Sequence, residues 1–212
     1  MEAQITRVIE ENELEFFRLD HNTHPGPGLQ TRRDGYVENG YLRYFQQLYA
    51  IYDRLRARFP EVIFENCAGG GGRSDVGLVR RFSHTWVTDW QIAPRSFAIT
   101  NGMSMALPPE YVDRLVGGQS GYTTADIDFQ NRLLLFVRPT VGFSKPMGAE
   151  WNPVQLERLK RFIGLYKSFV RPFMSTGRIY HHTPCVSNPE PRGWGVLELA
   201  SREGDRAICG LF

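Results

Sequence analysis

The feature that most constrains this chain is a short apolar run that ends in four consecutive glycines. Val62-Ile63-Phe64 predicts a buried strand, and residues 65–68 lead from it directly into Gly69–Gly72. Glycine adopts positive φ at little steric cost and lets the backbone approach a ligand closely. The sequence therefore predicts a strand whose exit is shaped for a tight turn or for a bound molecule.

Two other apolar runs end in an acidic residue. Residues 14–19 predict a buried strand that stops at Asp20, and residues 85–88 predict another that stops at Asp89, between Trp86 and Trp90. The carboxyl ends of parallel strands lie at the same edge of a sheet, which is where α/β enzymes collect their polar groups. We therefore expect Asp20 and Asp89 to face one cavity.

Strand-like and helix-like patterns alternate along most of the chain. Apolar periodicity predicts helices over residues 3–11, 40–59 and 75–82, then from about Thr124 and from Asn152-Pro153. Such alternation is typical of βα units and a parallel sheet. A complete (β/α)8 barrel typically needs about 250 residues, so residues 1–176 are expected to form only the latter part of a TIM barrel.

The residue pattern changes from helix-like and strand-like units to strand-like segments alone after Gly177. Residues 195–200 and 206–212 alternate like two strands of a hairpin, joined through Glu203-Gly204-Asp205. Residues 177–212 are therefore expected to begin a separate antiparallel β domain. The predicted fold class is α/β, with a partial barrel followed by this β domain.

Composition excludes several function classes. The formal net charge is only +2, and no stripe of Lys or Arg indicates a nucleic-acid partner. Cys67, Cys185 and Cys209 are few and widely spaced, which favours a reducing, cytoplasmic setting over a disulfide framework. The sequence shows no signal peptide and no apolar stretch of about 20 residues, so no membrane partner is expected.

Two carboxylates facing one cavity are the minimum for hydrolysing a glycosidic bond. One attacks the anomeric carbon or activates water, and the other protonates the leaving oxygen. Arg18 favours an ionised Asp20 if both side chains share a strand face, whereas Trp86 and Trp90 are expected to desolvate Asp89. An acid at a strand end is nevertheless more often a turn or capping residue than a catalyst.

Other constellations admit competing interpretations. The glycine run could cradle a phosphate, but no Gly-Lys-Ser/Thr or GxGxxG pattern accompanies it. Cys67 could be a nucleophile beside His84, and the histidines at 21, 24, 181 and 182 could bind metal, although no third ligand follows at a telling spacing. We favour a loop or pocket role for these residues and expect no metal or organic cofactor.

The order of these motifs resembles glycoside hydrolase family 36, the microbial α-galactosidases. The most specific part is the run Phe-Glu-Asn-Cys-Ala-Gly-Gly-Gly-Gly-Arg over residues 64–73, preceded by Asp20-His21-Asn22 and followed by Thr85–Asp89. The resemblance implies a retaining mechanism with Asp20 as nucleophile, ending barrel strand 4, and Asp89 as acid/base, ending strand 6. The chain would then cover about strands 4 to 8. It further implies a sugar pocket lined by Arg18, Asn22, Cys67, Gly69, Gly70 and Trp86.

The resemblance also has departures and alternatives. The family usually has Lys-Trp-Asp-Met-Asn where this chain has residues 18–22, Arg-Leu-Asp-His-Asn. The family's N-terminal β domain and first three barrel strands are absent, so the chain is expected to self-associate or to lack an N-terminal portion. The expected substrate is a galactoside oligosaccharide. The alternatives are an α-N-acetylgalactosaminidase of the same family and a non-catalytic or decayed carbohydrate-binding fragment.

Overall fold

A computed structural model describes residues 1–22, 30–90, 93–116, 127–141, 153–183 and 192–212. The chain divides into two compact units, Met1–Thr85 and Trp86–Phe212. We call them the first and the second unit and describe each by itself. The helices expected from about Thr124 and from Asn152-Pro153 are present as α5 and α6, whose bounds are given below, but the expected first residues Thr124 and Asn152 lie outside the described residues, as do His24 and Cys185.

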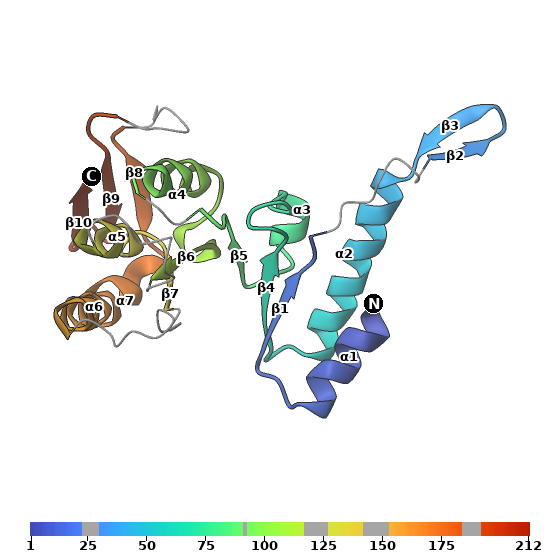
Figure 1. Cartoon of the computed structure of the whole chain (residues 1–212), viewed down its shortest axis with the longest axis horizontal. Coiled ribbons are helices and arrows are strands. Elements are labelled where there is room, and N and C mark those ends of the chain that lie inside the picture. The colour runs from blue at the N-terminus through green and yellow to red at the C-terminus, as the bar shows by residue number, and fades with distance from the viewer. Residues whose placement is uncertain (23–29, 91–92, 117–126, 142–152, 184–191) are drawn as a thin grey trace. The chain divides into compact units, whose positions relative to one another are not determined.

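The first unit follows the predicted order of strands and helices. Its elements are α1 (Glu2–Glu11), β1 (Phe16–Asp20), β2 (Gln30–Arg33), β3 (Tyr36–Asn39), α2 (Tyr41–Arg58), β4 (Ile63–Cys67), α3 (Val76–Val79) and β5 (His84–Trp86), and Figure 1 labels them. The helix expected over residues 75–82 is wrong in length: Asp75 is the N-cap, its side chain accepting the Leu78 N–H, and only one turn follows. The hairpin β2–β3 was not predicted.

Strands β1, β4 and β5 form parallel ladders in the first unit. In the first ladder Phe16 pairs with Ile63, Arg18 with Glu65 and Asp20 with Cys67. In the second, Glu65 pairs with His84. Because neighbouring residues in this register share a face, Arg18 and Asp20 of β1 lie on the same side as Glu65 and Cys67 of β4.

Helices α1 and α2 cover the other side of this sheet. Phe64 of β4 is fully buried there, and Phe17 and Leu19 of β1 pack against the same core. The buried core residues of the first unit are Ile5, Ile9, Leu48, Tyr52, Leu55, Phe64, Leu78 and Phe82. The apolar stripe of α2 packs in this core, as its periodicity predicted, and so leaves the opposite strand face for polar side chains.

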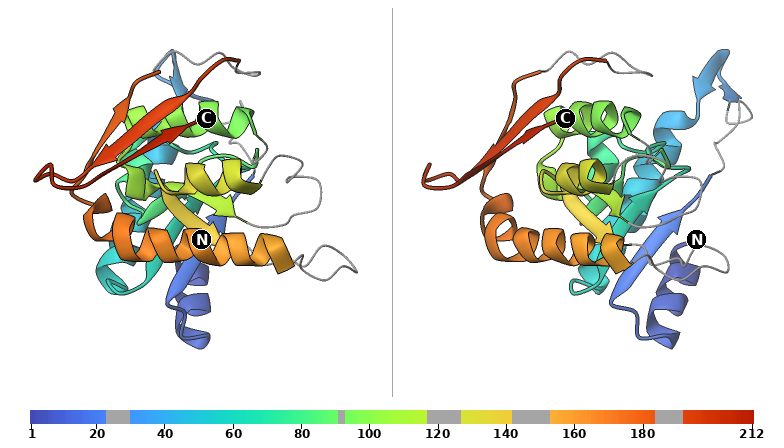
Figure 2. Two further views of the ribbon diagram at one scale, coloured as in Figure 1. Left: turned by 90° about the vertical axis from the view of Figure 1, so that its left-hand side faces the viewer. Right: turned by 60° about the vertical axis from the view of Figure 1, so that its left-hand side comes forward.

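The second unit continues with helices and parallel strands before an antiparallel sheet. Its elements are α4 (Arg95–Ala106), a 3-10 turn (Pro109–Tyr111), β6 (Val112–Val116), α5 (Ile127–Leu134), β7 (Arg138–Val141), α6 (Pro153–Leu165), a π-helical turn (Tyr166–Val170), α7 (Arg171–Met174), β8 (Arg178–His181), β9 (Val196–Ala200) and β10 (Ala207–Leu211). Strands β6 and β7 pair in parallel. Figure 2 shows α6 and α7 as one nearly continuous helical stretch.

The C-terminal sheet confirms the predicted hairpin and adds a strand to it. Strands β9 and β10 pair antiparallel, and β8, which was not predicted, pairs on the other edge of β9. Leu197 and Leu199 of β9 are fully buried in the same core as Phe97 of α4 and Phe136. The sheet thus shares its core with the helices before it, and the domain border at residues 176 and 177 stays a prediction.

Within the described residues, every helix is too short or too polar to cross a membrane.

Candidate functional site

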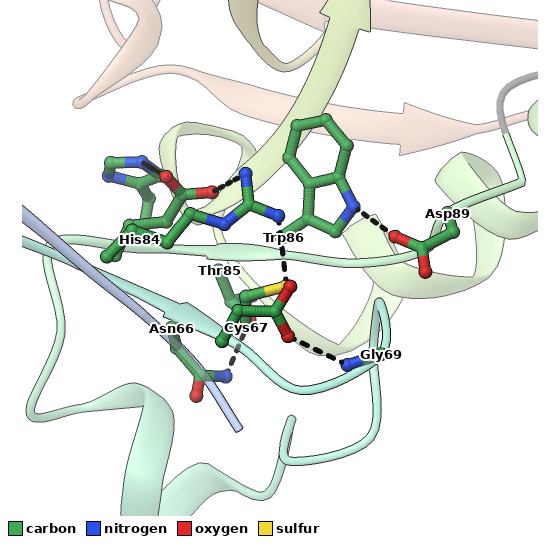
Figure 3. A network of polar contacts seen from close by, with 10 residues as sticks. Asn66, Cys67, Gly69, His84, Thr85, Trp86 and Asp89 are labelled. Carbon is green, nitrogen blue, oxygen red and sulfur yellow. Dashed lines mark hydrogen bonds and ion pairs between the residues drawn. The ribbon is translucent and has the colours of Figure 1, made fainter. Parts of the chain in front are cut away.

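The polar face of β1 and β4 carries most of the residues that the sequence singled out. Arg18 and Asp20 stand beside their ladder partners Glu65 and Cys67, while Phe64 points to the core on the opposite face. Figure 3 shows this face at close range. Arg18 and Asp20 were predicted to share a strand face if side chains alternate to the end of the strand, and this alternation holds up to the last residue of β1.

Asp20 is the last residue of β1, and its side chain is exposed. Its Oδ1 accepts a hydrogen bond from the backbone N–H of Gly69 at 3.2 Å. A backbone donor from the glycine loop therefore orients one carboxylate oxygen. A carboxylate held in this way at a strand end is suited to attack an electrophilic carbon or to contact a hydroxyl group.

The glycine loop has the backbone that the sequence predicted. Gly69 and Gly70 adopt φ values of +54° and +80°, in the left-handed region that glycine tolerates best. A Cβ on Gly69 would lie 3.4 Å from Asn22 Oδ1, so Asn22 also reaches this loop. At Gly72 a Cβ would lie 2.5 Å from the Ala68 carbonyl oxygen, which leaves no room for a side chain.

Arg18 contacts both of the β4 residues on this face. Its Nη2 donates to Cys67 Sγ at 3.1 Å, and its Nη1 lies 3.6 Å from Glu65 Oε1. Burial alone would lower the pKa of Arg18, but the hydrogen bond to Cys67 and the charges of Glu65 and Asp20 raise it. The guanidinium is thus a fixed positive charge beside Asp20, as the sequence predicted.

Cys67 is buried, and burial raises the pKa of its thiol despite hydrogen bonds from the Gly70 backbone and Arg18. A nucleophilic cysteine needs the opposite shift, because the thiolate is the reactive form. The alternative in which Cys67 is a nucleophile beside His84 therefore loses support. The thiol accepts a hydrogen bond from Arg18 and so helps to orient it, and its contact with a sugar stays a prediction.

Asn66 has a structural role that sequence reasoning missed. Its side chain faces the core, where Nδ2 donates to the Arg73 carbonyl at 2.7 Å and to Thr85 Oγ1 at 2.8 Å. It thereby joins β4 to β5 and closes the base of the glycine loop. An asparagine between two short apolar runs was the available signal, but its partners could not be identified without the strand pairing.

Asp89 and Trp86 lie together in the second unit. The indole Nε1 of Trp86 donates to Asp89 Oδ1 at 2.9 Å, and the Asp89 side chain is exposed. Trp90 is 42% exposed, and the Arg95 guanidinium lies over its ring at 3.9 Å. Trp86 therefore contacts Asp89 by a hydrogen bond, and the expected enclosure of this carboxyl group by both tryptophans is not observed.

His21, His181 and His182 each have a protein partner at a ring nitrogen. His21 Nδ1 lies 2.9 Å from Arg73 Nη2. His181 Nε2 lies 3.0 Å from Ser104 Oγ, and burial lowers the pKa of this histidine. His182 Nε2 lies 2.9 Å from Glu198 Oε2 on the C-terminal sheet.

The structure thus forms two clusters from the predicted site residues. The first contains Arg18, Asp20, Asn22, Cys67 and the glycine loop, all in the first unit. The second contains Trp86 and Asp89. The convergence of Asp20 and Asp89 on one cavity stays a prediction.

Comparison with known proteins finds one matching family model and several curated relatives. The melibiase family model matches residues 1–177. "Alpha-galactosidase 1" of Pediococcus pentosaceus is 27% identical over 223 residues, which cover 99% of this chain and 28% of that protein. "Probable alpha-galactosidase C" of Aspergillus flavus is 26% identical over 220 residues, covering 99% of this chain and 26% of that protein. The chain therefore spans about a quarter of the length of these curated relatives.

Solved structures share the fold. The GH36 α-galactosidase AgaA from Geobacillus stearothermophilus superposes with a TM-score of 0.82 at 20% identity, covering 99% of this chain and 29% of AgaA. An AgaA variant in complex with stachyose superposes with a TM-score of 0.83 at the same identity and coverage. These similarities confirm the predicted fold class: parallel strands and helices followed by an antiparallel sheet, as in part of a GH36 barrel and its C-terminal β domain.

Proposed function

The chain belongs to the melibiase family, as its resemblance to glycoside hydrolase family 36 implied, and from this premise we propose that it is the part of a retaining α-galactosidase that supplies both catalytic carboxylates. The substrates would be oligosaccharides with a terminal α-D-galactosyl residue. Relatives named as α-galactosidases support this proposal, as do AgaA variants crystallised with stachyose and raffinose.

The observation that carries the proposal is the position of Asp20. The carboxylate stands at the carboxyl end of β1, oriented by the Gly69 N–H and flanked by Arg18 and Cys67. Barrel enzymes place their reactive groups at this end of their strands. The glycine loop lets a sugar approach the backbone closely at the same place.

In the proposed reaction Asp20 attacks the anomeric carbon while Asp89 protonates the departing glycosidic oxygen. The aglycone leaves, and the galactosyl group remains bound to Asp20 as an ester with inverted configuration. Asp89, now ionised, takes a proton from water, which attacks the same carbon and releases galactose with the original configuration. The hydrogen bond from Trp86 would hold Asp89 in place for both steps.

Azide rescue tests the role of Asp20 in the protein that carries these 212 residues. Replacing Asp20 by Ala is expected to lower hydrolysis of an aryl α-galactoside by several orders of magnitude, and added azide should restore aryl release with formation of β-galactosyl azide. Asp53→Ala is the matched control, because Asp53 is an exposed acid on α2 that pairs with Arg81. Unchanged hydrolysis in Asp20→Ala would show that Asp20 is not the nucleophile.

The same assay separates the alternatives. Turnover of an aryl N-acetyl-α-galactosaminide in preference to the galactoside would identify the second enzyme of the family. Binding of a galactoside without any turnover by the wild-type protein would indicate a carbohydrate-binding role instead.

A further inference from the structure

A row of polar side chains runs across the strands of the first unit, two residues before Asp20 along β1. Arg18, Glu65 and His84 are register partners on β1, β4 and β5. Glu65 and His84 are 3% and 1% exposed, and Glu65 Oε2 lies 3.8 Å from His84 Nε2. Figure 3 labels His84 of this row and the nearby Cys67. Glu65 therefore places a buried carboxyl group between a guanidinium and an imidazole.

Three groups of the first unit interact favourably with the positive charge of Arg18. Glu65 and Cys67 contact it directly, and the charge of Asp20 also acts on it. Glu65 is buried whereas Asp20 is exposed. A buried carboxylate depends much more on a cationic partner than an exposed one does, because water cannot solvate it. We therefore expect the Arg18 guanidinium to pair with Glu65 rather than with Asp20.

We propose that Glu65 is a positioning residue of this site, which holds the Arg18 guanidinium at Cys67 and so prevents it from forming a closed ion pair with Asp20. The proposal rests on the proposed function only in what it says about Asp20 as a nucleophile. The placement of Arg18 by Glu65 is a statement about the first unit alone.

The chemical reason is that an arginine can either support or disable a neighbouring carboxylate. At a distance, its charge favours the ionised form. In a closed, bidentate pair the guanidinium occupies both carboxylate oxygens and withdraws the electron pair that must attack carbon. Glu65 keeps Arg18 in the first arrangement. Without it, Arg18 is expected to turn toward Asp20, whose charge already acts on the guanidinium.

The Cys67 thiol reports the position of Arg18 without any need for turnover. Arg18 lowers the pKa of this thiol through a hydrogen bond and through its charge. Loss of a neighbouring carboxylate charge would by itself lower the pKa of the thiol, so a raised thiol pKa in Glu65→Gln indicates that Arg18 has moved away from the sulfur. The titration is followed by NMR in protein labelled with ¹³C at cysteine Cβ, and the Cys67 signal is assigned with Cys67→Ser.

Glu65→Gln is expected to raise the pKa of the Cys67 thiol, as Arg18→Gln does, because both variants remove the guanidinium from the sulfur. The double variant should match Arg18→Gln alone, since Glu65 acts through Arg18. Glu65→Asp, which withdraws the carboxylate by one methylene and keeps its charge, should give a smaller shift in the same direction. It also covers the case in which Glu65→Gln does not fold.

The control is Glu15→Gln, an exposed acid immediately before β1 that should leave the thiol titration unchanged. An unchanged or lowered thiol pKa in Glu65→Gln and Glu65→Asp would overturn the proposal, because Arg18 would then hold its place without Glu65.

Kinetics test the consequence for Asp20 separately. If the protein hydrolyses an aryl α-galactoside, Glu65→Gln should lower kcat roughly tenfold at nearly unchanged KM, and adding Glu65→Gln to Arg18→Gln should have no further effect. If Glu65→Gln lowered kcat equally in the wild-type protein and in Arg18→Gln, Glu65 would not act on Asp20 through Arg18. A wild-type protein without hydrolysis would count against the proposed function, while the thiol titration would still decide the role of Glu65.

Discussion

At the scale of single residues, Gly69 combines two requirements of the site. Its backbone N–H orients Asp20, and it does so from a φ of +54°. Other residues adopt this region at a cost of about 1 kcal/mol or more. The position therefore needs glycine for conformation as well as for close approach to a ligand.

Replacing Gly69 by Ala should lower the free energy of unfolding by about 1 kcal/mol, since alanine has to adopt a positive φ at this position. Gly102→Ala is the matched control. Gly102 lies in helix α4 with nothing within 4 Å of an added Cβ, so alanine should stabilise the protein by roughly 0.5–1 kcal/mol. Urea unfolding measures both. A Gly69→Ala variant as stable as the wild type would contradict this account of the loop.

Some residues of the site could be predicted from sequence and others could not. Arg18 and Asp20 share a face because alternation along one strand is a local property. Asn66 depends on partners 7 and 19 residues later in the chain, and the Arg18–Cys67 contact joins residues 49 positions apart. Those contacts follow from the register of β1, β4 and β5, which no single apolar run specifies.

At the scale of elements, strand β10 shows how the C-terminal sheet joins the helices. Its side chains alternate: Leu211 is 54% exposed, whereas the neighbouring Phe212 ring lies 4.8 Å from Phe97, 5.4 Å from Phe129 and 5.9 Å from Phe136. Aromatic rings at such distances contribute both buried area and favourable edge contacts. Phe212, the residue after β10, therefore fixes the end of the strand to this aromatic cluster, in addition to the pairing of β10 with β9.

Phe212→Ala should lower the free energy of unfolding by about 2–3 kcal/mol, because it leaves a cavity among three aromatic rings and the surrounding core cannot fully collapse. The neighbouring Leu211→Ala should change the unfolding free energy by less than about 0.5 kcal/mol, since Leu211 faces solvent. Thermal unfolding of the two variants compares them directly. Similar losses in both would show that the cluster does not hold the strand.

Element prediction succeeded where periodicity is long and failed where it is short. The stripe over 18 residues of α2 and the two alternating strands β9 and β10 were recognised. Strand β8 has only four residues, Arg178–His181, and three of them, Arg178, Tyr180 and His181, carry titratable side chains. Its pairing with β9 is what makes it a strand, and that pairing is a property of the folded chain.

At the scale of the whole molecule, apolar side chains lie on the same strand face as Asp20. Phe16 and Ile63 are register partners and are 45% and 39% exposed. Exposed apolar groups on a sheet face indicate an interaction surface when they adjoin one another. We therefore expect this face to be covered in solution, and a second copy of the chain is the partner always available to the 212-residue protein.

The 212-residue chain is thus expected to self-associate, and the double variant Phe16→Ser, Ile63→Ser should shift it toward the monomer because serine removes most of the apolar surface at this pair. Val76→Ser is the control, since Val76 is 71% exposed on α3 and away from the sheet face. Light scattering after size-exclusion chromatography over a range of concentrations measures the mass of all three proteins. A wild-type chain that remains monomeric throughout, or a double variant that associates as strongly as the wild type, would show that this face does not drive assembly.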